Sequence, residues 1–251
     1  MTSARRAESD LHPATRGFGL AADLYERGRP DYPAPAIAWL AERLGLQPGR
    51  TVVDLAAGTG KLTRLLVPSG AEVIAVEPIA EMRALIRGAR AIEGTAERMP
   101  LTDASVDAVT VGQAFHWFRD EEALAEIHRV LRPSGGLGLI WNTRDMTDAV
   151  QAAVSEIIDP LSGDVPRRHK RDWREVVDAS GLFTPTELAT FPHEQLLDED
   201  GLVDRFLSIS FVAAAPPDVR ADVEARLRAL GRDHGAPVRL PYVTEVYVAF
   251  S

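Results

Sequence analysis

The chain alternates short β-branched runs with longer amphipathic stretches from Ala21 onward, and this alternation limits the possible folds more than any other feature. It is typical of β-α-β units, in which helices connect parallel strands and cover the sheet. No internal repeat accompanies it. We therefore expect an α/β fold, with a doubly wound, mostly parallel seven-stranded sheet, helices on both faces and an antiparallel last strand.

Hydrophobic runs and the Gly and Pro residues that end them locate the individual elements. The expected strands are 51–56, 72–78, 90–93, 106–114, 136–142, 186–196 and 238–250. The spacing of apolar residues predicts helices within 60–70, 79–89, 120–131, 146–158, 172–180, 199–209 and 217–232. Residues 237–251 alternate apolar and polar side chains, as an edge or hairpin strand does, so we place them in the same sheet, antiparallel to 186–196.

The composition excludes several functions. The chain has no cysteine, which rules out disulfides, thiolate metal sites and a cysteine nucleophile, and we expect it to be cytoplasmic. Its net charge of −9 disfavours nucleic acid and anionic membranes as partners, and we interpret the basic segment 167–171 as a surface turn. We find no apolar stretch typical of a signal peptide or a membrane span. The histidines show no metal-ligand spacing, so we expect no metal.

The most informative segment is V-V-D-L-A-A-G-T-G-K-L-T (52–63), which places a glycine-bearing turn between a buried strand and a helix. Such a turn lets a ligand approach bare backbone at the carboxyl end of a parallel sheet. Glu77 ends the next strand, about 20 residues after Gly58, where dinucleotide folds carry the carboxylate that binds the ribose hydroxyls. The pattern therefore predicts a nucleoside-binding crevice.

The spacing around the turn distinguishes between three possible ligands. A P-loop would need a glycine at Leu55 and a serine or threonine at Leu62, so this is not a P-loop. A dinucleotide fingerprint would need a glycine at Thr63, and Asp54 at the strand end would repel phosphates. S-adenosylmethionine carries a sulfonium and an ammonium group but no phosphate, so an acidic turn favours it over NAD.

The segment D-L-A-A-G-T-G (54–60) resembles the first motif of class I S-adenosylmethionine-dependent methyltransferases, Asp/Glu-x-Gly-x-Gly-x-Gly, with Ala56 at the first glycine. Further motifs of that family follow in order: V-I-A-V-E-P (73–78), E-G-T-A-E-R-M-P-L (93–101), V-G-Q-A-F-H-W-F (111–118) and E-I-H-R-V-L-R-P-S-G-G-L (126–137). The ordered set is similar to the methyltransferase type 11 branch, which includes trans-aconitate and quinone-biosynthesis methyltransferases. The resemblance is firm from about residue 18 to 142 and implies a Rossmann-like fold.

The resemblance also implies contacts to the cofactor. Glu77 would hold the ribose, Glu97 would accept a hydrogen bond from the adenine amino group, and Gln113 would lie beside the methionine moiety. In the preceding lid segment 21–33, Tyr25 and Arg29 would contact the carboxylate end of the cofactor. The full set of expected cofactor contacts is Tyr25, Arg29, Asp54, Ala56, Gly58, Gly60, Glu77, Pro78, Ala96, Glu97 and Gln113.

The methyl acceptor is expected just past the carboxyl end of strand 106–114, beside His116 and Trp117, with Trp141 as a further wall. A histidine in that place could take a proton from a hydroxyl, a carboxyl or an acidic carbon, and is the candidate catalytic residue. The alternative is that His116 packs or shapes the pocket without taking part in the reaction.

We therefore predict an enzyme that transfers a methyl group from S-adenosylmethionine to a small organic acceptor (a carboxylate, hydroxyl or activated carbon) and releases S-adenosylhomocysteine. The alternatives are an NAD-dependent oxidoreductase and a non-catalytic S-adenosylmethionine-binding protein. We expect a monomer or homodimer with a mobile tail at 1–15 and one domain at 16–251. Within that domain we expect lid helices at 16–47, a cofactor-binding core at 48–145, and substrate-side helices with the last two strands at 146–251.

Overall fold

The computed structural model describes residues 26–163 and 172–251. They form a seven-stranded sheet in the order β3-β2-β1-β4-β5-β7-β6. The strands are Thr51–Leu55 (β1), Glu72–Val76 (β2), Arg90–Ile92 (β3), Val106–Gly112 (β4), Leu131–Arg144 (β5), Glu187–Leu197 (β6) and Val238–Phe250 (β7). The predicted tail at 1–15 and the basic segment 167–171 lie outside the described residues.

The strand directions confirm the predicted fold class. Neighbouring strands from β3 to β5 pair in parallel, whereas β7 runs antiparallel to both β5 and β6. β7 lies between these two strands, so β6 and not β7 forms the edge of the sheet. The sequence of β7 agrees with this interior place, because the four consecutive residues 246–249 are all buried, as in a strand covered on both faces.

The helices connect and cover these strands. They are Ala34–Arg43 (α4), Lys61–Leu66 (α5), Ala80–Arg83 (α6), Asp120–Val130 (α7), Ala149–Ile158 (α8), Trp173–Ala179 (α9), Glu199–Leu207 (α10), Ser210–Ala213 (α11) and Pro217–His234 (α12). The helix predicted at 79–89 is reduced to the four-residue α6. The α-helical hydrogen bonding ends there, because the amides of the following Leu85 and Ile86 donate to carbonyls three residues back, at 3.0 and 3.2 Å, as in a tighter 3-10 turn.

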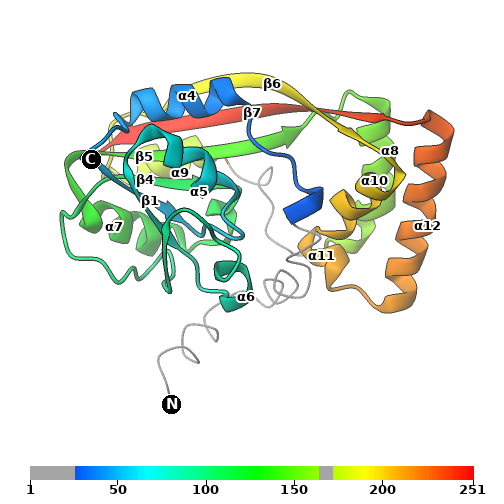
Figure 1. The fold of residues 1–251 in the computed structure, drawn as a ribbon, viewed down its shortest axis with the longest axis horizontal. Coiled ribbons are helices and arrows are strands. Elements are labelled where there is room, and N and C mark those ends of the chain that lie inside the picture. Colours follow the sequence, from blue (N-terminus) through cyan, green and yellow to red (C-terminus); the bar gives the residue numbers. More distant parts are fainter. Residues whose placement is uncertain (1–25, 164–171) are drawn as a thin grey trace, which may run out of the picture.

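Apolar cores lie on both faces of the sheet. On β5, Trp141 points into the core beneath α7 and α9, whereas the adjacent Ile140 points into the core beneath α4 and α5. A third core joins α8, α10 and α12 to the first half of β7. In Figure 1, β5, β6 and β7 run from the main sheet out to these helices. Among the described helices, none combines the length and apolar character needed to cross a membrane.

Candidate active site

A strained turn follows β1 at the carboxyl edge of the sheet. Ala56, Gly58 and Gly60 all have positive φ angles, of 54°, 59° and 87°. The amide of Ala57 donates to the carbonyl of Val76 at 3.1 Å, which ties the turn to the end of β2. Ala56 occupies the place where the resembling motif has glycine, and an alanine in this left-handed region costs about 1 kcal/mol or more. Strain of this kind is typical of functional turns.

Glu77 lies directly beside this turn and holds it in place. Its Oε2 accepts a hydrogen bond from the amide of Gly58 at 2.8 Å, and its Oε1 accepts one from the amide of Ile79, also at 2.8 Å. The side chain is buried, and burial raises the pKa of Glu77 to about 7, against the effect of the two amides and of Arg83. The two motifs that contain Gly58 and Glu77 therefore meet at one point.

Asp54 is a second buried carboxyl group at the same edge. Its Oδ2 accepts a hydrogen bond from Thr63 Oγ1 at 2.5 Å, while its buried Oδ1 has no hydrogen-bond partner among the described residues. Burial is the main cause that raises the pKa of Asp54 to about 7, and Glu77 adds to the rise. Two adjacent carboxyl groups with raised pKa values fit a cationic ligand far better than a phosphate.

The loop after β3 packs against the end of β2. A Cβ on Gly94 would lie 2.9 Å from Val76 Cγ1, so the loop approaches the strand closely. Ala96 is buried, and Oε1 of Glu97 accepts a hydrogen bond from the amide of Arg119 at 3.0 Å. The carbonyl of Pro78 accepts from Arg83 Nη1 at 3.0 Å.

The residues expected near the acceptor follow β4. Gln113 has a positive φ of 59°, and His116 and Trp117 lie on the 3-10 helix Phe115–Trp117. The His116 ring centroid is 4.9 Å from that of Trp117 and 5.4 Å from that of Trp141. Trp141 is only 1% exposed and stacks on Trp173, so it forms a wall behind His116 rather than an open surface.

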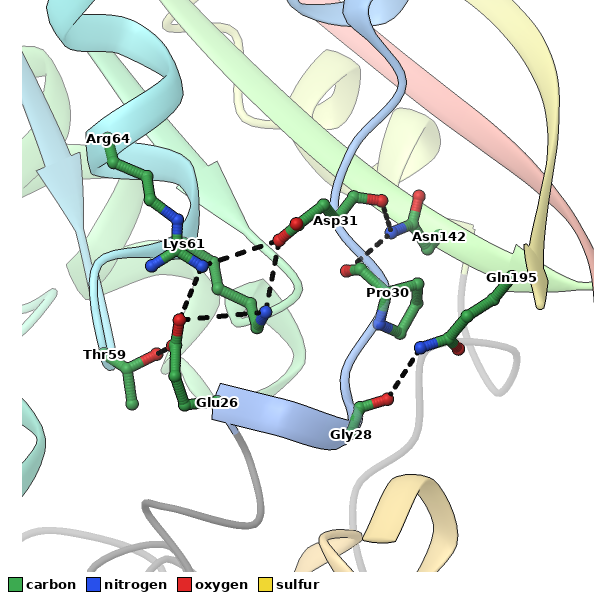
Figure 2. A network of polar contacts seen from close by, with 9 residues as sticks. All are labelled: Glu26, Gly28, Pro30, Asp31, Thr59, Lys61, Arg64, Asn142 and Gln195. Atoms are coloured by element: carbon green, nitrogen blue, oxygen red, sulfur yellow. Dashed lines mark hydrogen bonds and ion pairs between the residues drawn. The ribbon is translucent and has the colours of Figure 1, made fainter. Parts of the chain in front are cut away.

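Residues 26–32, here called the strap, run across the site from the glycine turn toward β5 and β6. Figure 2 shows the first half of its contacts: Glu26 accepts a hydrogen bond from Thr59 Oγ1 at 2.6 Å and forms an ion pair with Arg64 at 2.6 Å. Lys61 Nζ lies 3.1 Å from Asp31 Oδ1. The strap is thereby attached to the first turns of α5. The predicted contact Tyr25 lies outside the described residues.

The other contacts of the strap reach the opposite side of the site. Asn142 Nδ2, on β5, donates to the carbonyl of Asp31 at 3.1 Å, and Gln195 Nε2, on β6, donates to the carbonyl of Gly28 at 3.0 Å. A Cβ on Gly28 would lie 2.6 Å from the backbone of Asp204 and Arg205 on α10. The strap therefore joins the glycine turn to the C-terminal helices.

A small polar cavity of about 50 Å³ lies between the strap and the ends of β1, β4 and β5. Four predicted residues, Arg29, Asp54, Ala56 and Gln113, line it together with Asn142 and Arg205, which the sequence analysis missed as site residues. Two features of the sequence could have identified them. Asn142 ends a predicted strand, and Arg205 is a cation on an otherwise apolar helix face. Among the described residues, no group of three or more His, Asp or Glu side chains is arranged to hold a metal ion.

The comparisons with known proteins all find methyltransferases. A family model described as "Methyltransferase domain" matches residues 53–139. An uncharacterised methyltransferase of Mycobacterium tuberculosis is 41% identical over 240 residues, which cover 90% of this chain and 92% of the relative. A ubiquinone/menaquinone biosynthesis C-methyltransferase of Rubrivivax gelatinosus is 43% identical over 95 residues, or 36% of this chain and 38% of that protein. A solved structure from Anaeromyxobacter dehalogenans, described as a type II methyltransferase, matches with a TM-score of 0.59 at 26% identity, covering 89% of this chain and 97% of that chain.

Proposed function

This chain belongs to the methyltransferase domain family, and from that premise we propose that it transfers the methyl group of S-adenosylmethionine to a small organic acceptor. Because it belongs to this family, it is an S-adenosylmethionine-dependent enzyme. The acceptor class, the contacts of single residues, the division into lid, core and substrate-side parts, the monomeric or homodimeric state and the cytoplasmic location stay predictions.

The buried polar groups of the site fit this cofactor. Asp54 Oδ1 is a buried acceptor atom without a partner, and an ammonium group would supply the missing donor. Glu77 has lone pairs beyond those used by Gly58 and Ile79, and a ribose diol would use them. Ala56, Gly58 and Gly60, the three left-handed residues of the turn, leave the floor of the site free of bulky side chains. Arg29, at the other wall of the cavity, suits the methionine carboxylate.

The chain's own residues would act mainly by positioning. When bound, the cofactor supplies an electrophilic methyl group on a sulfonium. The turn at 56–60 and Glu77 would hold the donor, and the strap and α10 would keep water from the reacting atoms. His116 lies against Trp117 and Trp141, which orient its ring, so it can take the proton of a hydroxyl or carbon acceptor.

The observation that carries this proposal is the direct hydrogen bond between Gly58 and Glu77, beside a second buried carboxyl group. The test is isothermal titration of the full chain with S-adenosylmethionine, S-adenosylhomocysteine and NADH. We expect one molecule of either S-adenosyl compound to bind and NADH not to bind, because a diphosphate would lie against Asp54. Binding of NADH alone would instead support the oxidoreductase.

Turnover is tested separately with methyl-labelled S-adenosylmethionine and a panel of small acids, alcohols and activated carbon compounds. Label in a product supports the proposal, whereas tight cofactor binding with no transfer to any acceptor would support a non-catalytic protein. With the first acceptor found, His116→Gln should lower kcat by about 10²- to 10⁴-fold if His116 is the base, and leave it nearly unchanged if it only shapes the pocket.

A further inference from the structure

Arg205, on α10, is a buried cation to which no described residue offers a carboxylate. The residue is 4% exposed, and its Nε donates to Tyr242 Oη at 3.0 Å. Its Nη1 is buried and has no hydrogen-bond partner, and within 26–163 and 172–251 it forms no ion pair. The rings of Phe206 and Tyr242, 5.0 and 5.8 Å from Cζ, compensate its charge only in part. A buried guanidinium left in this state is costly unless a ligand supplies the anion.

The side chain of Arg205 lines the same cavity as Asp54 and Gln113, but it comes from the opposite side. Asp54 lies in β1 and Gln113 follows β4, whereas α10 packs in the C-terminal group of helices with α12. The cavity, of about 50 Å³, has room for a group the size of a carboxylate. Arg205 therefore lies where the C-terminal helices meet the predicted reaction site.

The expected cofactor would not supply this anion. S-adenosylmethionine has one carboxylate, and Arg29 of the strap lines the cavity as its expected partner. The sulfonium adds a positive charge to the same region, so cofactor binding makes the need for a further anion greater. Resting on the function proposed above, we propose that Arg205 binds a carboxylate of the methyl acceptor, which is therefore a small organic acid.

The surroundings of Arg205 agree with a polar acceptor. On one face of β6, His193 Nδ1 and Gln195 Oε1 are also buried, and neither has a hydrogen-bond partner in the part of the chain that the structure describes. The His193 ring packs edge-on against Tyr242, the residue that orients Arg205, with centroids 5.6 Å apart. Gln195 donates a hydrogen bond to the carbonyl of Gly28, and Gly28 in turn packs on the backbone of Arg205. A planar guanidinium held by Tyr242 suits the two oxygens of a carboxylate.

The experiment measures binding of small acids to the protein saturated with S-adenosylhomocysteine. The probes are succinate, glutarate, citrate and benzoate, each compared with its neutral amide by titration calorimetry. We expect at least one acid, and not its amide, to bind the wild type, and Arg205→Met to weaken it by about tenfold or more. Arg205→Lys should restore part of the affinity, since it keeps the charge but loses the planar fork. In every variant the affinity for S-adenosylhomocysteine should change by less than about twofold.

Arg144→Met is the matched control. Arg144 lies over the same Phe206 ring, 5.2 Å from its centroid, but two of its nitrogens donate to Gln151, so its removal should not change acid binding. Equal binding of acids to wild type and Arg205→Met, or no binding of any acid to the wild type, would overturn the proposal. A loss of S-adenosylhomocysteine affinity confined to Arg205→Met and Arg205→Lys would assign Arg205 to the cofactor instead. Failure of the wild type to bind S-adenosylhomocysteine would refute the proposed function itself.

Discussion

The amide of Gly58 donates to Oε2 of Glu77 at 2.8 Å, and this one hydrogen bond joins the turn after β1 to the end of β2. Because the second oxygen of Glu77 accepts from Ile79, the carboxylate is fixed on two sides by backbone. Such a carboxylate keeps one orientation without a ligand, so little side-chain entropy is lost when a diol binds to its remaining lone pairs.

Replacing Glu77 tests this arrangement directly. Glu77→Gln keeps the size of the side chain, but its single carbonyl oxygen can accept from only one of the two amides, and it carries no charge for the ribose hydroxyls. We expect the affinity for S-adenosylhomocysteine to fall by about 1 to 3 kcal/mol, measured by titration calorimetry. Glu72→Gln, at the exposed opposite end of the same strand, is the control and should bind normally. An unchanged affinity of the Glu77 variant would show that the ribose lies elsewhere.

The raised pKa values of Asp54 and Glu77 predict how stability depends on pH. Both pKa values rise to about 7 on folding, from 3.8 and 4.5, so the folded protein binds protons more tightly than the unfolded chain. The stability that this contributes is complete below about pH 4 and is lost as the pH rises through about 7. Urea unfolding of the ligand-free protein should show it, with a flatter slope for Asp54→Asn. Asp107 and Glu126 have lowered pKa values, so the stability that they contribute has the opposite pH dependence: it is lost as the pH falls into the acid range.

Cofactor binding should show the reverse dependence on pH. A cationic ligand and ribose hydroxyls both favour the ionised carboxylates, so the affinity for S-adenosylmethionine should rise between about pH 6 and pH 8. Protons are then released on binding, and titrations in buffers of different ionisation enthalpy would count them. Affinity that stays constant over this range in the wild type would mean that neither carboxyl group is coupled to the ligand.

Thr63 hydrogen-bonds the buried carboxyl group of Asp54. Its hydroxyl donates to Asp54 Oδ2 at 2.5 Å, and both side chains are buried. Thr63→Val has nearly the same shape but removes the hydroxyl donor of that buried oxygen, so the free energy of unfolding should fall by about 1 to 3 kcal/mol. The cost should be smaller in an Asp54→Asn background, because neighbouring partners are not additive. Equal costs in both backgrounds would show that the hydrogen bond contributes nothing.

The sequence predicted the fold well because the decisive signals are local. Apolar runs bounded by Gly and Pro located all seven strands, and the pairing of β6 with β7 is confirmed. The length of α6 was overestimated. The spacing of apolar residues does not show where backbone amides stop bonding the carbonyl four residues back and bond the one three residues back instead. The interior place of β7 depends on which strand it pairs with on each side, and no local pattern encodes that.

The candidate site could be predicted only where its residues lie in one continuous pattern. Gly58 and Glu77 belong to consecutive β-α units, and their contact follows from the fold. Asn142 and Thr244 form a 2.6 Å hydrogen bond although they are 102 residues apart, and Arg205 meets Tyr242 across 37 residues. The first contact depends on the pairing of β5 with β7, and the second on how α10 packs against β7, and family motifs gave no guide to either.

Gly28 tests whether the strap closes the site. Its φ is ordinary, but a Cβ there would lie 2.6 Å from backbone atoms of Asp204 and Arg205, which cannot move aside. Gly28→Ala should therefore lift the strap from α10 and reduce the free energy of unfolding by about 1 to 3 kcal/mol. Amide hydrogen exchange over residues 26–32 should speed up, and S-adenosylhomocysteine should bind more weakly.

The matched control for this substitution is Gly231→Ala, near the C-terminal end of α12. A Cβ at Gly231 would lie 3.5 Å from Leu202 Cδ2, an ordinary contact, and alanine is favoured over glycine in a helix by up to about 1 kcal/mol. This variant should be as stable as the wild type or more so, with unchanged exchange in the strap. If Gly28→Ala behaves in the same way, the strap does not depend on its close packing against α10, and it would not link the cofactor site to the C-terminal helices.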